Sequence, residues 1–387
     1  MKIAILGTFT DYDLIANENR QGRAPGHPAA SKFNTAYYLS QITGNEVHLI
    51  TMNGEVNADQ HLKRNGLHFH FLKSTPLYKK LPTLFESNTW KMHDFLNELQ
   101  PDIVNGQHTL RDAYFAVTST FPSVITPRGL VDDWYNVKKV KAPIIQKYWE
   151  LLLEQRAIKR ARNVICISPV VRQYFEEHHL SATLFDIENP VNINFFSTNG
   201  AHRNLKKFAF VGGLGERKRA LDAVKAVISV NSAELDLIYH NEGSEAEAEL
   251  KQYVRQQNAA GRIHFVGYIP NANLHSKLRE SIGLILPTSA ECAPMSISEA
   301  MASGLLILAT NVDGIPYMIN DEITGYLFES GDVSTLATKI ETILRDPQRA
   351  LEMANNAKIV AEQRWHPELI TSQTMHAYRN IIREWDA

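Results

Sequence analysis

Short apolar runs alternate with segments of helical periodicity along almost the whole chain, and this alternation limits the possible folds more than any other feature. The apolar runs are short enough to be buried strands. Strands that alternate with helices form parallel sheets with helices on both faces, so we expect an α/β fold with doubly wound sheets. The expected strands are Lys2–Leu6, Val47–Thr51, His68–Phe71, Asp102–Asn105, Ser123–Thr126, Asn163–Ile167, Lys207–Val211, Leu235–Tyr239, Ile263–Val266, Gly283–Pro287, Leu305–Ala309 and Tyr326–Phe328.

A polar segment rich in turn residues, from Glu188 to Arg203, separates two sets of expected strands. We expect an N-terminal domain at residues 1–186 and a C-terminal domain at residues 187–365. A final helix at residues 366–387 is expected to join the first domain. Parallel sheets of this kind bind ligands at the carboxyl ends of their strands, so the loops that follow strands are where functional residues are expected.

Composition excludes several classes of function. The 387 residues have a formal net charge of −2, which gives no basic surface for nucleic acid. Two cysteines, Cys166 and Cys292, imply neither a disulfide framework nor a metal cluster, so a reducing compartment is expected. The first apolar run is too short for a signal peptide, and no run approaches the ~20 apolar residues of a membrane span. We expect a cytoplasmic protein.

Two glutamates lie eight residues apart after one expected strand. Glu291 falls in a loop, and Glu299 falls in the expected first turn of the next helix, which Ser296 is expected to cap. Helix N-termini attract anions, so the backbone near Met295 and Ser296 is a candidate phosphate site. Two carboxylates beside such a site suit a ligand with phosphates and sugar hydroxyls. The alternative is a capping box of Ser296 and Glu299, with Glu291 as a solvated charge.

A glycine-rich turn with two cations follows the strand expected at Lys207–Val211. Gly212 and Gly213 allow the backbone to approach a ligand closely. Arg217 and Lys218 place positive charge where a diphosphate would lie. One alternative is a dinucleotide-binding fingerprint, although Lys218 occupies the place of its third glycine. The other is a tight turn with a solvated basic pair.

These segments belong to an ordered series that resembles the retaining, nucleotide-sugar-dependent glycosyltransferases of group 1, family four, which have the GT-B fold. The resemblance is strong over residues 205–345, extends to residues 150–195 and is thin before them. It implies two Rossmann-like domains that face each other across a cleft, and sugar transfer with retention at the anomeric carbon. The matching segments are Phe210–Lys218, Arg262–Tyr268, Glu291–Glu299, Val312–Pro316, Thr324–Phe328 and Gly331–Asp332.

The resemblance also implies a role for each candidate residue. Glu299 is expected to bind the ribose hydroxyls, and Glu291 is expected to contact the donor sugar and support its anomeric centre. Lys218 and the helix N-terminus are expected to stabilise charge on the leaving diphosphate. The base is expected near Tyr268. We assign catalytic roles to Glu291, Lys218 and Arg128.

The sequence departs from the family pattern at several places. Gly213 stands where relatives have a diphosphate-binding arginine, so we expect Arg217 to supply the missing charge. Arg219 replaces a glycine of the same motif. Arg128 stands where relatives have a histidine near the transferred sugar, and an ordinary loop salt bridge is its alternative role. The loop Gly22–Ser31 lacks the Gly-Gly pair of the relatives.

The expected substrates are a nucleotide-diphosphate sugar, with UDP favoured, and a glycan or lipid-linked acceptor in cell-surface polysaccharide synthesis. No cofactor is expected, and the reaction is expected to need no metal. Asp11 and Asp13 have the spacing of a metal motif, but they lie in the wrong context. Basic residues between Lys138 and Arg162 are compatible with peripheral contact with the inner face of a membrane, although a solvated helix face is the commoner explanation.

Two other functions stay open at this stage. The departures at Gly213 and Arg128 are compatible with a non-catalytic partner that binds a sugar nucleotide for an active transferase. A nucleotide-sugar epimerase can share the GT-B architecture, but the sequence shows no acid and base for it.

Overall fold

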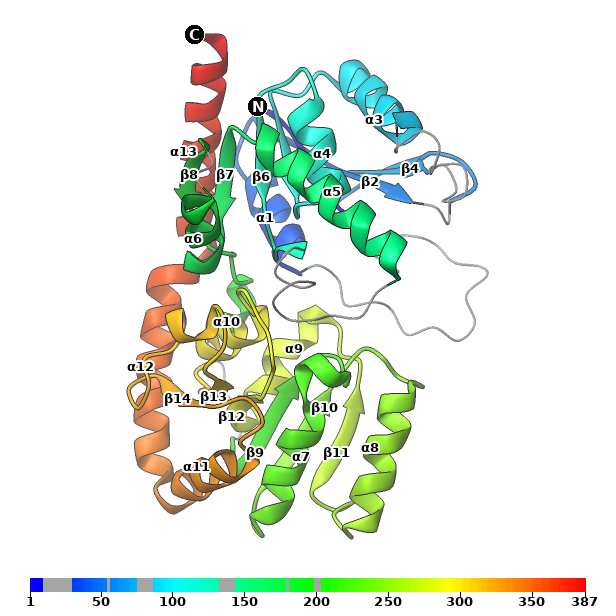
Figure 1. The fold of residues 1–387 in the computed structure, drawn as a ribbon. Coiled ribbons are helices and arrows are strands. Elements are labelled where there is room, and N and C mark those ends of the chain that lie inside the picture. The colour runs from blue at the N-terminus through cyan, green and yellow to red at the C-terminus, as the bar shows by residue number, and fades with distance from the viewer. Residues whose placement is uncertain (10–29, 54–55, 75–85, 132–142, 179–180, 198–202) are drawn as a thin grey trace. The chain divides into compact units, whose positions relative to one another are not determined.

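The computed structural model describes residues 1–9, 30–53, 56–74, 86–131, 143–178, 181–197 and 203–387 (Figure 1). The chain forms two compact units, each of which is described by itself. Unit 1 contains Met1–Phe9, Ser31–Pro190 and Pro367–Ala387, and unit 2 contains Val191–His366. The C-terminal residues Pro367–Ala387 therefore belong to unit 1, together with the N-terminal strand.

Unit 1 has, in its described residues, a sheet of eight strands in the order β3-β4-β2-β1-β5-β6-β7-β8. Only β3 is antiparallel to its neighbour within this sheet. The strands are β1 (Lys2–Leu6), β2 (Glu46–Asn53), β3 (Gln60–Arg64), β4 (Leu67–Lys73), β5 (Ile103–Gln107), β6 (Ser123–Thr126), β7 (Asn163–Cys166) and β8 (Thr183–Asp186). The helices are α1 (Ala30–Ser40), α3 (Glu86–Leu99), α4 (Arg111–Thr118), α5 (Ile144–Arg160), α6 (Pro169–Glu177) and α13 (Pro367–Asp386).

Unit 2 has a parallel sheet of six described strands in the order β11-β10-β9-β12-β13-β14. The strands are β9 (Asn204–Val211), β10 (Glu234–Ile238), β11 (Ile263–Gly267), β12 (Ser281–Leu286), β13 (Leu306–Thr310) and β14 (Gly325–Phe328). The α-helices are α7 (Ala220–Ser229), α8 (Glu245–Gln256), α9 (Asn271–Leu278), α10 (Met295–Ala302), α11 (Val333–Arg345) and α12 (Pro347–Trp365). Short 3₁₀ turns are η2 (Ile193–Phe196), η3 (Glu216–Lys218) and η4 (Ile315–Tyr317).

Successive side chains of β9 point to opposite faces of the sheet and pack into two separate hydrophobic clusters of unit 2. Phe208 and Phe210 pack with α7, α8 and α11 on one face of the sheet. Ala209 and Val211 pack with α9 and α10 on the other face. Successive side chains of a strand point to opposite faces, so a strand that is covered on both faces must be apolar throughout. The run in β12 is buried along its whole length for this reason.

The C-terminal helix α13 is anchored to unit 1 by a buried polar contact. Tyr378 is fully buried, and its hydroxyl accepts a hydrogen bond of 2.7 Å from the side-chain amide of Asn105 in β5. A buried polar side chain without such a partner would destabilise the fold. The contact therefore selects the position of α13 in unit 1.

The expected strands are all present, with ends shifted by a few residues, and the predicted α/β fold with doubly wound sheets is confirmed. Two strands were not predicted, β3 and β8. Both lie at the edges of the sheet of unit 1, and β3 is mostly exposed, so neither needs a run of apolar residues. Within the described residues, no helix is long and apolar enough to cross a membrane.

Candidate functional site

The two loops that carry the main candidate residues follow neighbouring strands of unit 2. β9 and β12 are paired and parallel, so their carboxyl ends lie at the same edge of the sheet. The loop after β9 contains Gly212–Arg219, and the loop after β12 contains Glu291. The topology therefore brings together segments that are far apart in the sequence.

Glu291 contacts both predicted cations. Its carboxylate lies 2.6 Å from the ammonium nitrogen of Lys218, and it accepts a short hydrogen bond from the guanidinium of Arg217. Arg217 also donates a 2.9 Å hydrogen bond to the carbonyl of Ala290. Glu291, Arg217 and Lys218 thus form one cluster with a formal charge of +1, at the site where the sequence predicts them.

The charge state of Glu291 follows from these contacts. Burial alone would raise the pKa of its carboxyl, but the charges and hydrogen bonds of Lys218 and Arg217 outweigh burial and lower it. Glu291 is therefore ionised at neutral pH. It holds two cations at the place where the sequence predicts a diphosphate.

Backbone hydrogen bonds fix the two loops against each other. The carbonyl of Arg217 accepts hydrogen bonds of 2.8 Å from the amide of Ser289 and 2.9 Å from the hydroxyl of Thr288. The amide of Glu291 donates a 2.8 Å hydrogen bond to the carboxylate of Asp313. Asp313 is a site residue that was not predicted, although it lies in the matching segment Val312–Pro316. Its position after a strand was the signal that could have identified it.

Glu299 has a very different environment from Glu291. It lies in α10, is 2% exposed, and its Oε1 has no hydrogen-bond partner among the described residues. Burial raises the pKa of Glu299 to about 8. A buried oxygen without a partner is costly, which makes this carboxyl a candidate for hydrogen bonds with a bound ligand.

The predicted start of this helix was wrong. α10 begins at Met295 with Pro294 as its N-cap, and no side chain caps it. Ser296 is the second helical residue, and its buried hydroxyl has no hydrogen-bond partner in the described structure. Glu299 consequently lies in the second turn rather than the first. Because Ser296 lies inside the helix and not at its N-cap, the capping box of Ser296 and Glu299 does not form.

The glycine-rich turn has the close approach that the sequence predicts. Gly212 has a φ of 152°, and a Cβ there would lie 3.2 Å from the side chain of Lys218. Gly213 does not have a positive φ, and a Cβ there would be 3.4 Å from the imidazole of His240, which is ordinary contact. Gly212 is thus required by the backbone, whereas position 213 has room for a side chain.

Arg219 explains why relatives have a glycine at its position. Its φ of 51° and ψ of 41° are left-handed, so helix α7 begins only after it, at Ala220. The side chain of Arg219 donates a 2.6 Å hydrogen bond to Asp222 in the first turn of α7. This ion pair offsets part of the backbone strain.

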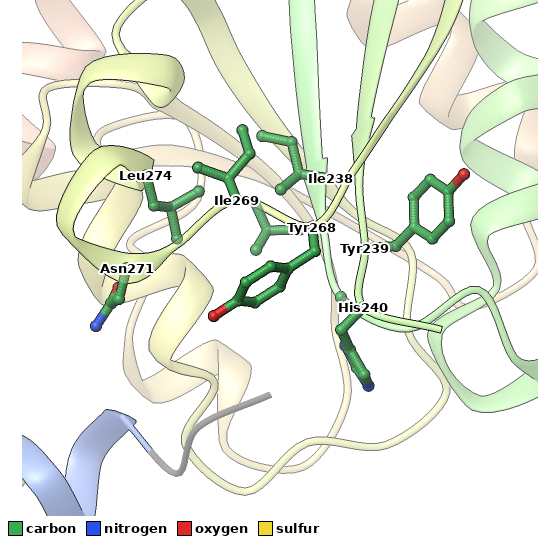
Figure 2. Close-up of a pocket in the computed structure, with 9 residues that line it drawn as sticks. Ile238, Tyr239, His240, Tyr268, Ile269, Asn271 and Leu274 are labelled. Atoms are coloured by element: carbon green, nitrogen blue, oxygen red, sulfur yellow. The ribbon is translucent and has the colours of Figure 1, made fainter. Parts of the chain in front are cut away.

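A small pocket lies at the carboxyl ends of β9, β10 and β11 in unit 2 (Figure 2). Figure 2 shows that the rings of Tyr268 and His240 extend into the same open region. The pocket is lined by Val211, Gly212, Ile238, Tyr239, His240, Tyr268, Ile269, Asn271 and Leu274. The rings of Tyr268 and His240 beside this mostly apolar pocket offer faces on which a flat aromatic base can stack. Sequence analysis proposed Tyr268 but missed His240, which directly follows an expected strand.

Arg128 belongs to a polar network in unit 1. Its guanidinium donates hydrogen bonds of 2.8 Å to the Oε1 of Gln107 and 2.8 Å to the hydroxyl of Ser31, and it also donates to Asn189. Gln107 in turn donates to Asn105, which contacts α13. These three partners of Arg128 are neutral, so its charge is held by hydrogen bonds at the carboxyl end of β6.

The charge of Arg128 acts on two other basic side chains of unit 1, Lys32 and His108. Burial, followed by the charge of Arg128, lowers the pKa of Lys32 to about 8. Burial, together with the charges of Lys32 and Arg128, lowers the pKa of His108 to about 3. His108 also has a left-handed φ of 69° directly after β5. This combination of charge and strain is typical of functional sites.

Some predicted features lie outside the described residues. These are the possible metal pair Asp11 and Asp13, most of the loop Gly22–Ser31, and the basic residues from Lys138 to Lys141.

The two doubly wound sheets, with carboxylates, cations and a ring-lined pocket after the strands of unit 2, define a protein of the GT-B class. Two family models match consecutive parts of the chain. Glycosyltransferase Family 4 matches residues 33–195, and Glycosyl transferases group 1 matches residues 192–360. The two models together cover residues 33–360, so the chain belongs to the group 1, family 4 glycosyltransferases that they describe.

Similar proteins agree with this assignment. N-acetyl-alpha-D-glucosaminyl L-malate synthase of Bacillus anthracis is 27% identical over 186 residues, which are 48% of this chain and 48% of that relative. The chain thus spans about half the length of that relative. Sucrose-phosphate synthase from Thermosynechococcus elongatus has a TM-score of 0.80 and 20% identity, with 99% of both chains covered. HepE of Anabaena, solved in complex with UDP, has a TM-score of 0.74 and 16% identity, with 98% of this chain and 100% of HepE covered. The predicted GT-B fold is confirmed.

Proposed function

We propose that this protein is a retaining glycosyltransferase that moves a sugar from a nucleotide-diphosphate donor to an acceptor hydroxyl. The observation that carries the proposal is the contrast between two carboxyl groups of unit 2. Glu291 holds Lys218 and Arg217 at the end of β9, and Glu299 is buried with an unpartnered oxygen in the following helix. Retention at the anomeric carbon rests on the family resemblance.

The donor binds along the loops at the carboxyl ends of the strands in unit 2. The base lies in the pocket beside Tyr268 and His240, where two rings are available for stacking. The ribose hydroxyls donate hydrogen bonds to Glu299. The diphosphate lies between Lys218 and the first turn of α10, whose backbone N–H groups favour an anion. The sugar is then next to Glu291.

Transfer breaks the bond between the anomeric carbon and the diphosphate oxygen, the acceptor oxygen forms the new bond to that carbon, and the proton of the acceptor hydroxyl passes to the departing diphosphate. Negative charge grows on the departing diphosphate, while the anomeric carbon becomes electron-poor. Lys218 and Arg217 stabilise the first charge. The ionised Glu291 contacts the sugar hydroxyls and stabilises the second. In unit 1, Arg128 takes the place of the family histidine that approaches the transferred sugar.

We assign UDP as the nucleotide of the donor, since HepE, which has the same fold, was solved with UDP. The reaction proceeds without a metal, because Lys218 and Arg217 supply positive charge next to the diphosphate. Excess chelator should leave the rate of transfer unchanged. Complete loss of activity that Mg²⁺ or Mn²⁺ restores would refute this part of the proposal.

The acceptor is a glycan or lipid-linked hydroxyl of a cell-surface polysaccharide, and the protein acts in the cytoplasm at the inner face of the membrane. Support comes from the first turns of α5, where Ile144, Ile145 and Tyr148 are 87%, 67% and 63% exposed. Exposed apolar side chains of this kind can enter the interface of a bilayer. Sedimentation with anionic vesicles should decrease when Ile144 and Ile145 are both changed to Ser.

A non-catalytic role is the second candidate, because Gly213 and Arg128 replace two residues that the family uses at the donor. A panel of UDP-sugars, incubated with and without acceptors, distinguishes the two roles. A transferase releases UDP, slowly without acceptor and faster with the correct one. A protein that binds UDP-sugars tightly but releases no UDP under any condition would be the binding partner instead.

A further inference from the structure

A histidine-rich cluster lies on one face of the sheet of unit 1, outside every residue assigned above. β2 and β4 are parallel neighbours, and their register places His48 opposite His68. β3 is antiparallel to β4, and its register places His61 opposite His70. Because side chains alternate along a strand, Glu46 lies on the same face as His48, and His70 lies on the same face as His68.

One polar atom from each of Glu46, His48 and His68 has the spacing of metal ligands. Oε1 of Glu46 is 3.2 Å from Nε2 of His48 and 3.7 Å from Nε2 of His68. One ligand atom from each of these residues lies within 4.8 Å of the others. A tetrahedral ion with bonds of about 2.0–2.1 Å separates its ligand atoms by roughly 3.3–3.5 Å. The side chains therefore need only small shifts to bind one ion together.

The buried member of the cluster directs its Nε2 at the carboxylate of Glu46, where the ion would lie. His48 is 3% exposed, and its Nε2 makes no hydrogen bond among the described residues, although the carboxylate of Glu46 is near. A buried ring nitrogen in this state is unusual in a folded protein. A cation would give it a partner and would also neutralise Glu46.

The other ring nitrogen of His48 has the contact that a metal ligand normally has. Its Nδ1 is 2.9 Å from Nε2 of His70, and Nδ1 of His70 is 2.7 Å from Nδ1 of His61. When Nε2 of His48 binds an ion, its Nδ1 keeps the proton and donates it to His70, which donates in turn to His61. Such outer contacts fix the tautomer and the orientation of a ligating histidine.

We propose that Glu46, His48 and His68 form a binding site for one divalent transition-metal ion, with Zn²⁺ as the best match, and that His70 is a positioning residue. Two imidazoles and one carboxylate are a ligand set that zinc favours, and water would complete the tetrahedron.

The position of this site indicates a structural role. Glu46, His48 and His68 lie at the amino-terminal ends of β2 and β4, whereas Arg128 and His108 follow the carboxyl ends of β6 and β5. Ligands of such sheets bind at the carboxyl ends. The ion therefore links β2 and β4 at the edge of this sheet opposite to Arg128.

The test is a Zn²⁺ titration of the metal-free full-length protein in competition with a chromophoric chelator. The parent should bind one Zn²⁺ per chain in competition with the chelator. Glu46→Gln and His68→Gln should each weaken binding at least tenfold, and both side chains are exposed enough for the variants to fold. His264→Gln is the matched control, since His264 lies 3.7 Å from Glu234 with no second histidine ligand among the described residues. It should bind Zn²⁺ as the parent does.

Thermal unfolding gives a second readout that does not depend on enzymatic activity. Zn²⁺ should raise the midpoint of the parent and of His264→Gln, because a ligand that binds only the folded state stabilises it. It should have less effect on His68→Gln. The proposal is overturned if the parent binds Zn²⁺ no more tightly than Glu46→Gln and His68→Gln do, or if all four proteins gain the same stability.

Discussion

Glu291 and Glu299 are close in sequence, but their surroundings are opposite. Glu291 lies in a loop and contacts two cations, which keep its pKa low and its carboxyl ionised. Glu299 lies inside α10 with a buried, unpartnered oxygen and a pKa of about 8. The loop carboxylate has its partners before any ligand is present, whereas the helical carboxyl does not. Ligand binding therefore adds the most hydrogen-bonding partners at Glu299 and rearranges existing ones at Glu291.

The largest effect is expected at Lys218, the cation whose ammonium nitrogen lies 2.6 Å from the carboxylate of Glu291. Lys218→Ala should lower the rate of sugar transfer by roughly 10²–10³-fold, because it removes a charge positioned at the leaving group. The measurement is kcat with saturating donor. Lys206→Ala, on the exposed end of β9, is the control. A Lys218→Ala rate within twofold of the parent would separate the cluster around Glu291 from catalysis.

Arg128 of unit 1, which stands where relatives have a histidine, should have the next largest effect. Arg128→Ala should lower kcat by about tenfold or more and change donor affinity less, because charge near the sugar acts mainly in the transition state. Gln107→Ala removes one partner of Arg128 and should give a smaller loss of kcat. An unchanged kcat for Arg128→Ala would leave that residue with a structural role only.

The pH dependence of nucleotide binding should separate the two glutamates. Ribose hydroxyls donate to the ionised form of Glu299, so binding favours loss of its proton. Since burial raises its pKa to about 8, UDP affinity should increase as the pH rises from 6 towards 8, by up to about tenfold per pH unit. Calorimetry in buffers of different ionisation enthalpy measures the released proton.

Glu299→Gln is the control for this titration, because the phosphate of UDP also changes protonation in the same range. The variant should show only the phosphate contribution. Equal pH slopes for the parent and Glu299→Gln would show that Glu299 does not ionise on binding.

The smallest effect is expected at Arg217, whose side chain is 56% exposed and already contacts Glu291. Arg217→Ala should weaken UDP binding by about 1 kcal/mol, because exposed charges are screened by solvent. Gly213→Arg in that background should recover part of the loss, since the backbone at position 213 accepts a side chain. Unchanged UDP affinity in Arg217→Ala would mean that Lys218 and the helix N-terminus suffice.

The sequence was sufficient for the fold because buried parallel strands leave a strong apolar signal. β12 is buried throughout and was predicted to within two residues at each end, whereas the exposed edge strand β3 has no such signal. The family resemblance implied that Glu291, Lys218 and Arg217 belong to one donor site.

Other properties of the site depend on three-dimensional surroundings that spacing does not encode. Spacing suggested that Ser296 caps a helix, but the observed N-cap is Pro294, two residues earlier. The burial of Glu299 and the partners of Glu291 depend on packing between segments distant in sequence. The register that brings His48 next to His68 was likewise not visible from either strand alone.

The central claim is that Glu299 binds the ribose of the donor nucleotide in unit 2. The most direct measurement is the calorimetric affinity of the parent and Glu299→Ala for UDP and for 2′-deoxy-UDP. The account predicts that Glu299→Ala weakens UDP binding by about 1–3 kcal/mol and weakens binding of the deoxy analogue less, because one of the lost hydrogen bonds involves the 2′-hydroxyl. If Glu299→Ala binds UDP as tightly as the parent does, the ribose is held elsewhere and the assignment of the site is contradicted.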